Sequence, residues 1–380
     1  MTLPSNLQND LTNCRLPVDE ASSLPAACYH SDFVSKQETE LIFHRHWLGL
    51  GRADRFKESG QFETMEIAGV PLILMLDNNK TLHAFNNACR HRGARLLEGS
   101  GNTSGVRCPF HSWYYSTDGQ LVSAPQMENT KRFCKKETGL FEFSLKIHAG
   151  FIFVCFSPNP PDFSKHIGDF DRIHAPWPID TLVSTRRTSF EVNCNWKLFI
   201  EVFNEYYHLQ SVHPQSLNDS YYIPNTADVT VGNYASQFGE TQGSSGLLPE
   251  KQNHALPLIP GLAKKEKSGA RYSWVYPNMT FALSPDAMWI YEAYPIAPNR
   301  CRAYQTICFP SSSLALDDFD MRANFYYERF DAAVEEDRIA LENQQRGMDS
   351  PFTTPGRFST VMEPSVSAFA SWYASQLQSA

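Results

Sequence analysis

The stretch from Asn195 to Pro214 contains two histidines, His208 and His213, and two acids, Glu201 and Glu205. Two imidazoles and one carboxylate are the ligands of a mononuclear non-haem Fe(II) site, provided that the third ligand comes from elsewhere in the chain. Taken alone, two histidines spaced in this way are more often ordinary surface or core residues than metal ligands. The rest of the chain therefore has to decide between these interpretations.

The periodicity of this stretch predicts a buried helix. Its apolar face is formed by Phe199, Val202, Phe203 and Tyr206. Glu201, Glu205 and His208 follow at steps of four and three residues, so we expect them on another shared face. His213 would lie about 140° round an ideal helix from His208. Both imidazoles can therefore reach one metal only if the helix bends, bulges or ends between them, and Pro214 is consistent with an end.

A more specific pattern of metal-binding residue types lies earlier in the chain. A C-x-H motif is followed, after the spacer 92–107, by a C-x2-H motif, and the four side chains are Cys89, His91, Cys108 and His111. A single Zn²⁺ ion could use two thiolates and two imidazoles. A Rieske-type [2Fe–2S] cluster takes two Cys on one iron and two His on the other. Zinc fingers usually keep like ligands together, so the mixed loops favour the Rieske cluster.

Composition excludes several classes of function. The chain has 380 residues, with 19% charged and 13% aromatic residues, which is typical of a folded globular protein. The net charge of −8 and the lack of a basic run argue against nucleic-acid binding. No apolar run is long enough for a membrane span, and no signal pattern precedes the fold. Nine cysteines without a disulfide framework predict a reducing cytoplasm.

The N-terminal half predicts a small antiparallel β domain. Residues 1–32 are expected to form an irregular arm, and Ser35–Trp47 is expected to form a helix. Alternating and apolar runs predict strands at Gln61–Ile67, Val70–Leu76, from His83 to Phe85, and Phe151–Phe156. The Pro-rich turn after Phe156 predicts that this domain closes near residue 160.

The C-terminal half predicts further strands and one long helix. Residues 215–270 show little periodicity, and we expect them to form a lid and substrate entry rather than a disordered insertion. Strands are predicted at Thr188–Val192, Ser273–Tyr276, Met279–Leu283, Ala287–Pro295 and Arg302–Phe309. The stretch Asp317–Arg346 is strongly helical.

This last helix could supply the third iron ligand. Asp337 shares a face with Val334 and Leu341, so its carboxylate borders apolar packing and needs a partner there. Glu336 also has apolar neighbours, so the pattern does not choose between the two acids. The plain alternative is that both belong to a solvated charge run.

Together these motifs resemble the catalytic (alpha) subunit of a Rieske non-haem iron oxygenase, in the ring-hydroxylating oxygenase family. The resemblance covers about residues 30–375 and includes Cys89–Gly93, Cys108–Trp113, Asn195–Lys197 and the Glu205, His208, His213 and Pro214 set. It implies an α+β fold. An antiparallel β Rieske domain (47–161) would follow an N-terminal arm and helix (1–46). A catalytic domain (162–380) would contain an antiparallel sheet flanked by helices, in a helix-grip-like arrangement.

The resemblance also implies the cofactors and their ligands. The [2Fe–2S] cluster would be held by Cys89, His91, Cys108 and His111. One mononuclear Fe(II) would be held by His208, His213 and Asp337, because Asp337 matches the position of the family's third ligand. An NAD(P)H-dependent reductase, directly or through a ferredoxin, would supply electrons, and O2 would supply the inserted oxygen.

Glu205 departs from the family pattern, in which many members carry Asp at this position. The resemblance implies that its carboxylate links His208 to His111 of a neighbouring chain, which gives Glu205 a catalytic role and implies a homotrimer. An interior salt bridge is the plain alternative. We expect Glu201 to be structural or to support a ligand, and not to bind iron.

Glu at this position is reminiscent of the branch that acts on quaternary amines such as carnitine, betaines and choline. The resemblance thus implies hydroxylation or N-dealkylation of a small quaternary amine. Aromatic rings could hold such a cation, and the residues considered for this are Tyr206, Tyr207, Trp289 and Tyr291. Two alternatives remain: an oxygenase acting on an aromatic acid or ring, and a Rieske electron-transfer protein without oxygenase activity.

Overall fold

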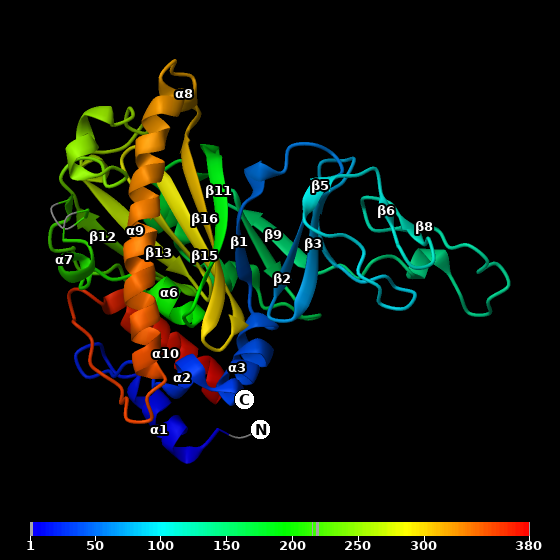
Figure 1. Ribbon diagram of the computed structural model, residues 1–380, viewed down its shortest axis with the longest axis horizontal. Helices are drawn as coiled ribbons and strands as arrows, with labels where there is room; N and C mark the ends of the chain where they lie inside the picture. Colours follow the sequence, from blue (N-terminus) through cyan, green and yellow to red (C-terminus); the bar gives the residue numbers. More distant parts are fainter. Residues whose placement is uncertain (1–2, 215, 218–219, 380) are drawn as a thin grey trace.

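The computed structural model describes residues 3–214, 216–217 and 220–379 and confirms the α+β class (Figure 1). A large body of helices and one broad sheet lies at the left of the view, and a smaller all-β part extends to the right (Figure 1). Among the described residues, no helix is both long enough and apolar enough to cross a lipid bilayer.

The all-β part is built around a four-stranded antiparallel sheet. Its strand order is β4 (Leu82–Asn86), β3 (Val70–Leu76), β2 (Gln61–Ile67) and β5 (Ser100–Asn102). The predicted bounds of β2 and β3 are confirmed. A second, smaller sheet contains β6 (Val106–Arg107), β7 (Tyr114–Tyr115) and β8 (Leu121–Ser123). Cys89 and Cys108 lie in the apolar core between these sheets.

A third sheet joins this part to the rest of the molecule. It contains β1 (Leu48–Arg52), β10 (Phe151–Cys155) and β9 (Ser144–His148). The predicted helix Ser35–Trp47 is wrong at its C-terminal end, because α3 (Asp32–Glu38) continues only through a π-helical turn, η1 (Thr39–Phe43). Trp47 instead donates a hydrogen bond from Nε1 to the Pro161 carbonyl (2.8 Å), which anchors the start of β1.

The N-terminal arm is more ordered than the sequence predicted, although residues 1–2 lie outside the described part. It contains α1 (Ser5–Asn13) and α2 (Ala27–His30). α1 packs on the C-terminal helix α10 (Pro364–Gln378), which is drawn in red in Figure 1. The domain boundaries expected at residues 46/47 and 161/162 stay predictions.

The large sheet is six-stranded and entirely antiparallel. Its order is β11 (Leu182–Val192), β16 (Arg300–Pro310), β15 (Met288–Ala297), β14 (Met279–Leu283), β13 (Gly269–Val275) and β12 (Tyr234–Glu240). All five predicted strands are present, and β14 has the predicted bounds. β12 lies inside the stretch 215–270 that was expected to be irregular, and positions 215 and 218–219 of that stretch lie outside the described residues.

Helices cover one face of this sheet. α9 (Phe319–Met348), drawn in orange, runs across it, with α6 (Trp196–Val202), α7 (Leu209–Val212) and α10 beside it (Figure 1). The other face packs against the third sheet and against α4 (Phe163–Ile167) and α5 (Phe170–His174). Shorter elements are α8 (Ser311–Leu314) and the 3-10 turns η2 (Ala53–Arg55), η3 (Lys135–Glu137), η4 (Ile179–Thr181), η6 (Pro249–His254) and η7 (Glu266–Ser268).

One buried carboxylate ties three of these helices together. Glu38 of α3 is 2% exposed and accepts hydrogen bonds from Lys197 Nζ, from Trp196 Nε1 (3.1 Å) and from Tyr373 OH. Lys197 is itself fully buried, so both charges depend on each other. Because a buried charge without its partner is costly, this pair fixes α6 against α3 and α10.

We expect Lys197→Met to destabilise the protein by about 3–5 kcal/mol, because Glu38 would keep its charge in the core without a counter-ion. The measurement is thermal unfolding followed by circular dichroism. Lys36→Met, on the exposed side of α3, is the matched control and should unfold at the wild-type temperature. Equal melting temperatures for Lys197→Met and wild type would contradict the role of the pair.

Candidate functional site

The helix predicted over 195–214 is wrong, because the chain is broken between Val202 and Leu209. The Asn204 side chain donates to the Ile200 carbonyl (2.7 Å) at the end of α6. His208 and His213 then flank the single turn of α7, one immediately before it and one immediately after it. α7 ends at Val212, and the non-helical backbone of His213 lets the two imidazole rings lie 5.1 Å apart between centroids, which a continuous helix could not do.

The same break separates the acids that were expected on one helix face. Glu201 turns away from the histidines and accepts a hydrogen bond from Tyr29 OH (2.9 Å). Desolvation by burial raises the pKa of Glu201 to about 7, partly offset by this hydrogen bond and by Lys197. Glu205 stays beside His208. Glu201 therefore lies outside the group around the histidines, as the sequence analysis expected.

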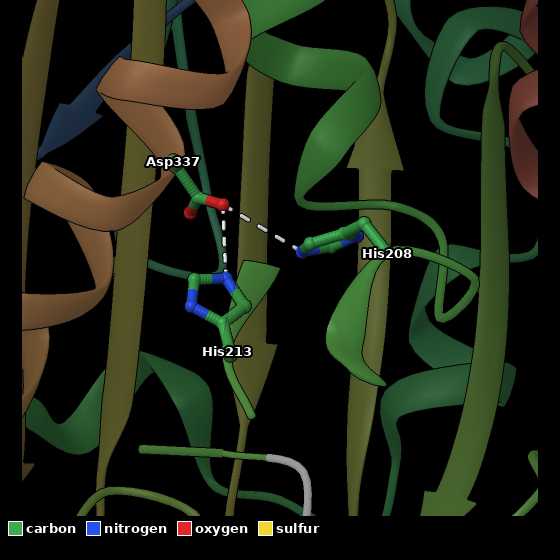
Figure 2. Close-up of side chains that lie close together, drawn as sticks. All are labelled: His208, His213 and Asp337. Carbon is green, nitrogen blue, oxygen red and sulfur yellow. Dashed lines mark hydrogen bonds and ion pairs between the residues drawn. The ribbon is translucent and has the colours of Figure 1, made fainter. Parts of the chain in front are cut away.

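The two imidazoles meet a carboxylate from α9. Figure 2 shows His208 and His213 turned toward the same oxygen of Asp337. Asp337 Oδ1 lies 2.9 Å from His213 Nε2 and 3.6 Å from His208 Nε2. The potential ligand atoms of the three residues all lie within 4.8 Å of one another. His213 and Asp337 are 1% and 2% exposed, so the set could hold a metal ion away from bulk water.

Each imidazole is held from behind by a second carboxylate. His208 Nδ1 lies 2.5 Å from Glu205 Oε1, and His213 Nδ1 lies 2.6 Å from Glu336 Oε2. Ser216 Oγ also donates to Glu336 (2.6 Å). A carboxylate that accepts the Nδ1 hydrogen leaves the Nε2 lone pair free for a metal and makes the ring a stronger ligand. The acids on α9 thus have different positions: Asp337 faces the metal site, and Glu336 orients His213.

The charges around His208 alter its proton affinity. Burial alone would lower the pKa of His208, but the hydrogen bond and charge of Glu205, together with Asp337, raise it above its ordinary value. A proton and a metal ion compete for the same nitrogen. Metal retention at this site is therefore expected to weaken as the pH falls.

A pocket opens directly in front of these ligands. Its cavity volume, the space that the centre of a water-sized sphere can occupy, is about 30 Å³, and its walls include aromatic rings, one arginine and the three potential metal ligands. Tyr206 and Trp289 line it, as the sequence analysis considered. The full lining is Val202, Phe203, Glu205, Tyr206, His208, Leu209, His213, Leu217, Tyr221, Tyr272, Trp289, Arg329, Ala333 and Asp337.

Two of the rings considered for the pocket lie elsewhere. Tyr207 is 65% exposed, and Tyr291 is stacked on Phe203 behind the wall (4.0 Å between centroids). No sequence pattern indicated that Tyr221 and Tyr272 line the pocket. Their hydroxyls are hydrogen-bonded to each other (2.6 Å). The two tyrosines come from different strands or loops, and no local pattern connects them.

The loops of the C-x-H and C-x2-H motifs have the same local structure. In the first, Cys89 N–H donates to the Ala94 carbonyl (2.8 Å) and Gly93 N–H donates to the Cys89 carbonyl (2.9 Å), with φ of +74° at Gly93. The second loop repeats both hydrogen bonds and the positive φ with the residues Cys108, Ser112 and Trp113. Each loop therefore holds its cysteine in the same backbone setting, while the histidine follows the cysteine by two residues in the first loop and by three in the second.

The four side chains of these loops come together. His91 Nδ1 and His111 Nδ1 lie 3.2 Å apart, and the His91 ring is stacked on Trp113 (4.8 Å). Both cysteines are buried, and Cys89 Sγ lies 3.3 Å from Tyr115 OH. Two buried thiols and two more exposed imidazoles match the donor set of a Rieske cluster, in which two Cys hold one iron and two His hold the other.

Two family models match the chain. The model of the ring hydroxylating alpha subunit (catalytic domain) matches residues 179–379, and the model of the Rieske [2Fe–2S] domain matches residues 46–134. The first covers more than half of the sequence. The chain belongs to the ring-hydroxylating alpha-subunit family. It is an oxidoreductase, and its cofactors are a Rieske [2Fe–2S] cluster and one mononuclear iron, so the alternative of a simple electron carrier is excluded.

Several relatives of this alpha subunit act on quaternary amines. The glycine betaine monooxygenase oxygenase subunit of Chromohalobacter salexigens is 26% identical, over 94% of this chain and 86% of the relative. The chloroplastic choline monooxygenase of Spinacia oleracea is 25% identical, over 98% of this chain and 82% of the relative. A solved quaternary ammonium Rieske monooxygenase that oxidises carnitine superimposes with a TM-score of 0.81 at 22% identity, over 99% of both chains. This last comparison shows the shared fold.

We expect Asp337→Asn and His213→Ala to lose the mononuclear iron while keeping the visible spectrum of the [2Fe–2S] cluster. Glu336→Gln should retain this iron about 10- to 100-fold more weakly, because it loosens the His213 ring without removing a ligand. The measurement is iron per chain during dialysis against a chelator.

Glu335→Gln is the matched control for Glu336→Gln. Glu335 is the preceding residue of α9 and pairs with Arg338 at the surface, so its variant should keep wild-type iron content. Equal iron loss in both variants, or full iron in Asp337→Asn, would contradict the roles given to these acids.

Proposed function

We propose that the chain is the terminal oxygenase that receives electrons at its Rieske cluster and oxidises a small quaternary amine at its mononuclear iron. Cys89, His91, Cys108 and His111 would hold the cluster, and His208, His213 and Asp337 would hold the lone iron. The observation that carries the proposal is the convergence of two Nε2 atoms and one carboxylate oxygen at the wall of an aromatic pocket. When bound, the two metal centres supply electron transfer and O2 activation.

The protein's own residues position the substrate and exclude water. Besides the two imidazoles, five aromatic rings line the space in front of the ligands: Phe203, Tyr206, Tyr221, Tyr272 and Trp289. Their faces can attract a trimethylammonium group by cation–π contact. The carboxylates beside the histidines add negative potential at the same end of the pocket. This supports oxidation at a methyl or methylene group next to the nitrogen, by hydroxylation or N-dealkylation.

Electron transfer is proposed to cross between chains of a homotrimer. Within one chain, the loops near β6 lie at the far right of Figure 1 and α7 lies at the left, at opposite ends of the long axis. Each centre has an exposed ring beside it: Phe110 next to His111 is 58% exposed, and Tyr207 next to His208 is 65% exposed. A second copy that covers both rings would bring its His111 toward Glu205. The electrons would come from an NAD(P)H reductase, with or without a ferredoxin.

A cytoplasmic location belongs to the same proposal. No disulfide links any of the nine cysteines in the part of the chain that the structure describes, which suits a reducing compartment.

The substrate class can be tested by O2 uptake with a generic NADH-dependent reductase. We expect uptake with at least one of glycine betaine, carnitine and choline, and none with benzoate or salicylate. Tyr206→Leu should raise KM about 2- to 30-fold by removing a cation–π contact. Tyr206→Phe is the matched control, because the hydroxyl has no hydrogen-bond partner among the described residues and only the ring is needed. Uptake with the aromatic acids alone would favour the aromatic-ring alternative instead.

The inter-chain route can be tested by complementation. A chain with His111→Ala lacks a working cluster, a chain with His213→Ala lacks the lone iron, and each variant alone should be inactive. Co-expressed, the two should form mixed trimers of the 43.1 kDa chain that regain part of the wild-type turnover. Light scattering measures the mass of the assembly. Mixed trimers without activity would contradict transfer between chains, and a monomeric mass would contradict the trimer.

A further inference from the structure

Arg329 is a buried cation in the wall of the substrate pocket. It lies on α9, is 3% exposed, and shares the buried stripe of this helix with Asp337. It plays no part in holding either metal centre. The inference below rests on the proposed function and identifies the substrate class more narrowly.

Arg329 differs from the other two arginines that are similarly buried. Arg52 lies 3.3 Å from the Asp54 carboxylate, and Arg271 is paired with Asp228. Among the described residues, no carboxylate lies within 4 Å of Arg329. Buried charges in proteins are normally paired, because desolvation is costly without a counter-ion. Of these three arginines, the one without a carboxylate partner is the one that lines the pocket.

The surroundings of Arg329 hold its guanidinium in place without neutralising it. The group lies over the rings of Phe330 (4.8 Å) and Trp289 (5.3 Å), and Nη2 donates to Tyr221 OH (3.3 Å). Its buried Nε has no hydrogen-bond partner among the described residues. A planar guanidinium with unused donors is suited to a carboxylate.

The charges are distributed unevenly along the pocket. Glu205, Glu336 and Asp337 surround the two imidazoles, which is one negative charge more than a ferrous ion neutralises. Arg329 lies eight positions before Asp337, about 12 Å along the helix axis. The pocket thus has a negative end at the metal site and a positive end at Arg329.

We propose that Arg329 binds the carboxylate of the substrate. The substrate is then a zwitterion that carries a quaternary ammonium group and a carboxylate, such as a betaine, and a purely cationic amino alcohol is disfavoured. The ammonium group lies toward the metal end, and the carboxylate supplies the counter-ion that Arg329 does not find among the described residues. Arg329 is a specificity-determining residue, and it takes no part in the chemical step.

Two matched pairs of ligands test the charge requirement on the holoenzyme by isothermal titration calorimetry. Glycine betaine and choline share the trimethylammonium group and differ in the carboxylate, and carnitine and its methyl ester differ in that charge and in one methyl group. We expect the carboxylated member of a pair to bind about 10- to 100-fold more tightly, as a charge-assisted hydrogen bond allows. Arg329→Gln should remove this preference, Arg329→Lys should keep part of it, and choline binding should not weaken.

The melting temperature of the Arg329 variants distinguishes a role in substrate recognition from a structural role. Arg346→Gln changes an exposed arginine of the same helix and is the matched control, with binding and melting temperature unchanged. Without ligand, Arg329→Gln should melt at or above the wild-type temperature, because it removes a buried charge that has no carboxylate partner in the described part of the chain. A lower melting temperature together with an equal loss of betaine and choline binding would overturn the proposal in favour of a structural arginine.

The remaining outcomes separate this inference from the proposed function. Turnover of choline but of no carboxylated amine would uphold a quaternary-amine oxygenase and overturn the role of Arg329. Arg329-dependent binding of benzoate, without turnover of any quaternary amine, would uphold the carboxylate site and overturn the proposed function. If Arg329→Gln binds every carboxylated ligand with the wild-type affinity, the inference is wrong.

Discussion

The candidate site depends on one geometric constraint. The Nε2 atoms of two imidazoles must point toward the same space beside one carboxylate oxygen, where a metal could lie. A free histidine can turn either nitrogen toward a metal, so both rings have to be fixed by an acceptor at Nδ1. Glu205 does this from the same turn as His208, and Glu336 does it from α9 for His213. The position of α9 over the sheet is therefore part of the site, since this helix supplies both Glu336 and Asp337.

Buried contacts away from the ligands hold the elements around the site in place. α6 ends just before the ligands, and its first turn is anchored through Lys197 and Trp196 to Glu38. Tyr373 of α10 joins the same carboxylate, so three helices meet at one buried charge. On the sheet side, Gly239 of β12 leaves room for Tyr206, because a Cβ at Gly239 would lie 2.8 Å from the tyrosine hydroxyl. The pocket wall is thus set by contacts with residues far away in sequence.

The sequence predicted the elements whose signal is local. β2, β3 and β14 follow from short apolar or alternating runs, and they have the predicted bounds. The long helix over 195–214 was wrong because Asn204 and Glu205 bind nearby backbone groups and interrupt it, although the apolar spacing continues. β12 was missed because Ser236 and Gly239 weaken its strand pattern.

The metal ligands were predicted less evenly. The C-x-H and C-x2-H motifs are short local patterns, so the sequence alone favoured a Rieske cluster. Glu336 and Asp337 are adjacent, and only the packing of α9 decides which of them faces His208 and His213. The sequence did not indicate that Arg329 is buried, because an arginine within a charged amphipathic helix is usually expected at the surface. Its burial follows from the aromatic residues that the sheet and the segment after α7 place around it.

The two ends of the pocket are constrained in different ways. Arg329 and Asp337 both belong to α9, so helical rise fixes the distance between the positive end and the metal site. The side walls come instead from separate elements, such as Tyr272 on β13 and Tyr221 on the irregular segment before β12. A change in that segment can alter the width of the pocket while α9 keeps the backbone positions of Arg329 and Asp337. The length of the accepted ligand is therefore set by a rigid helix, while its shape is set by side walls from strands and from the irregular segment, which can vary more freely than the strands.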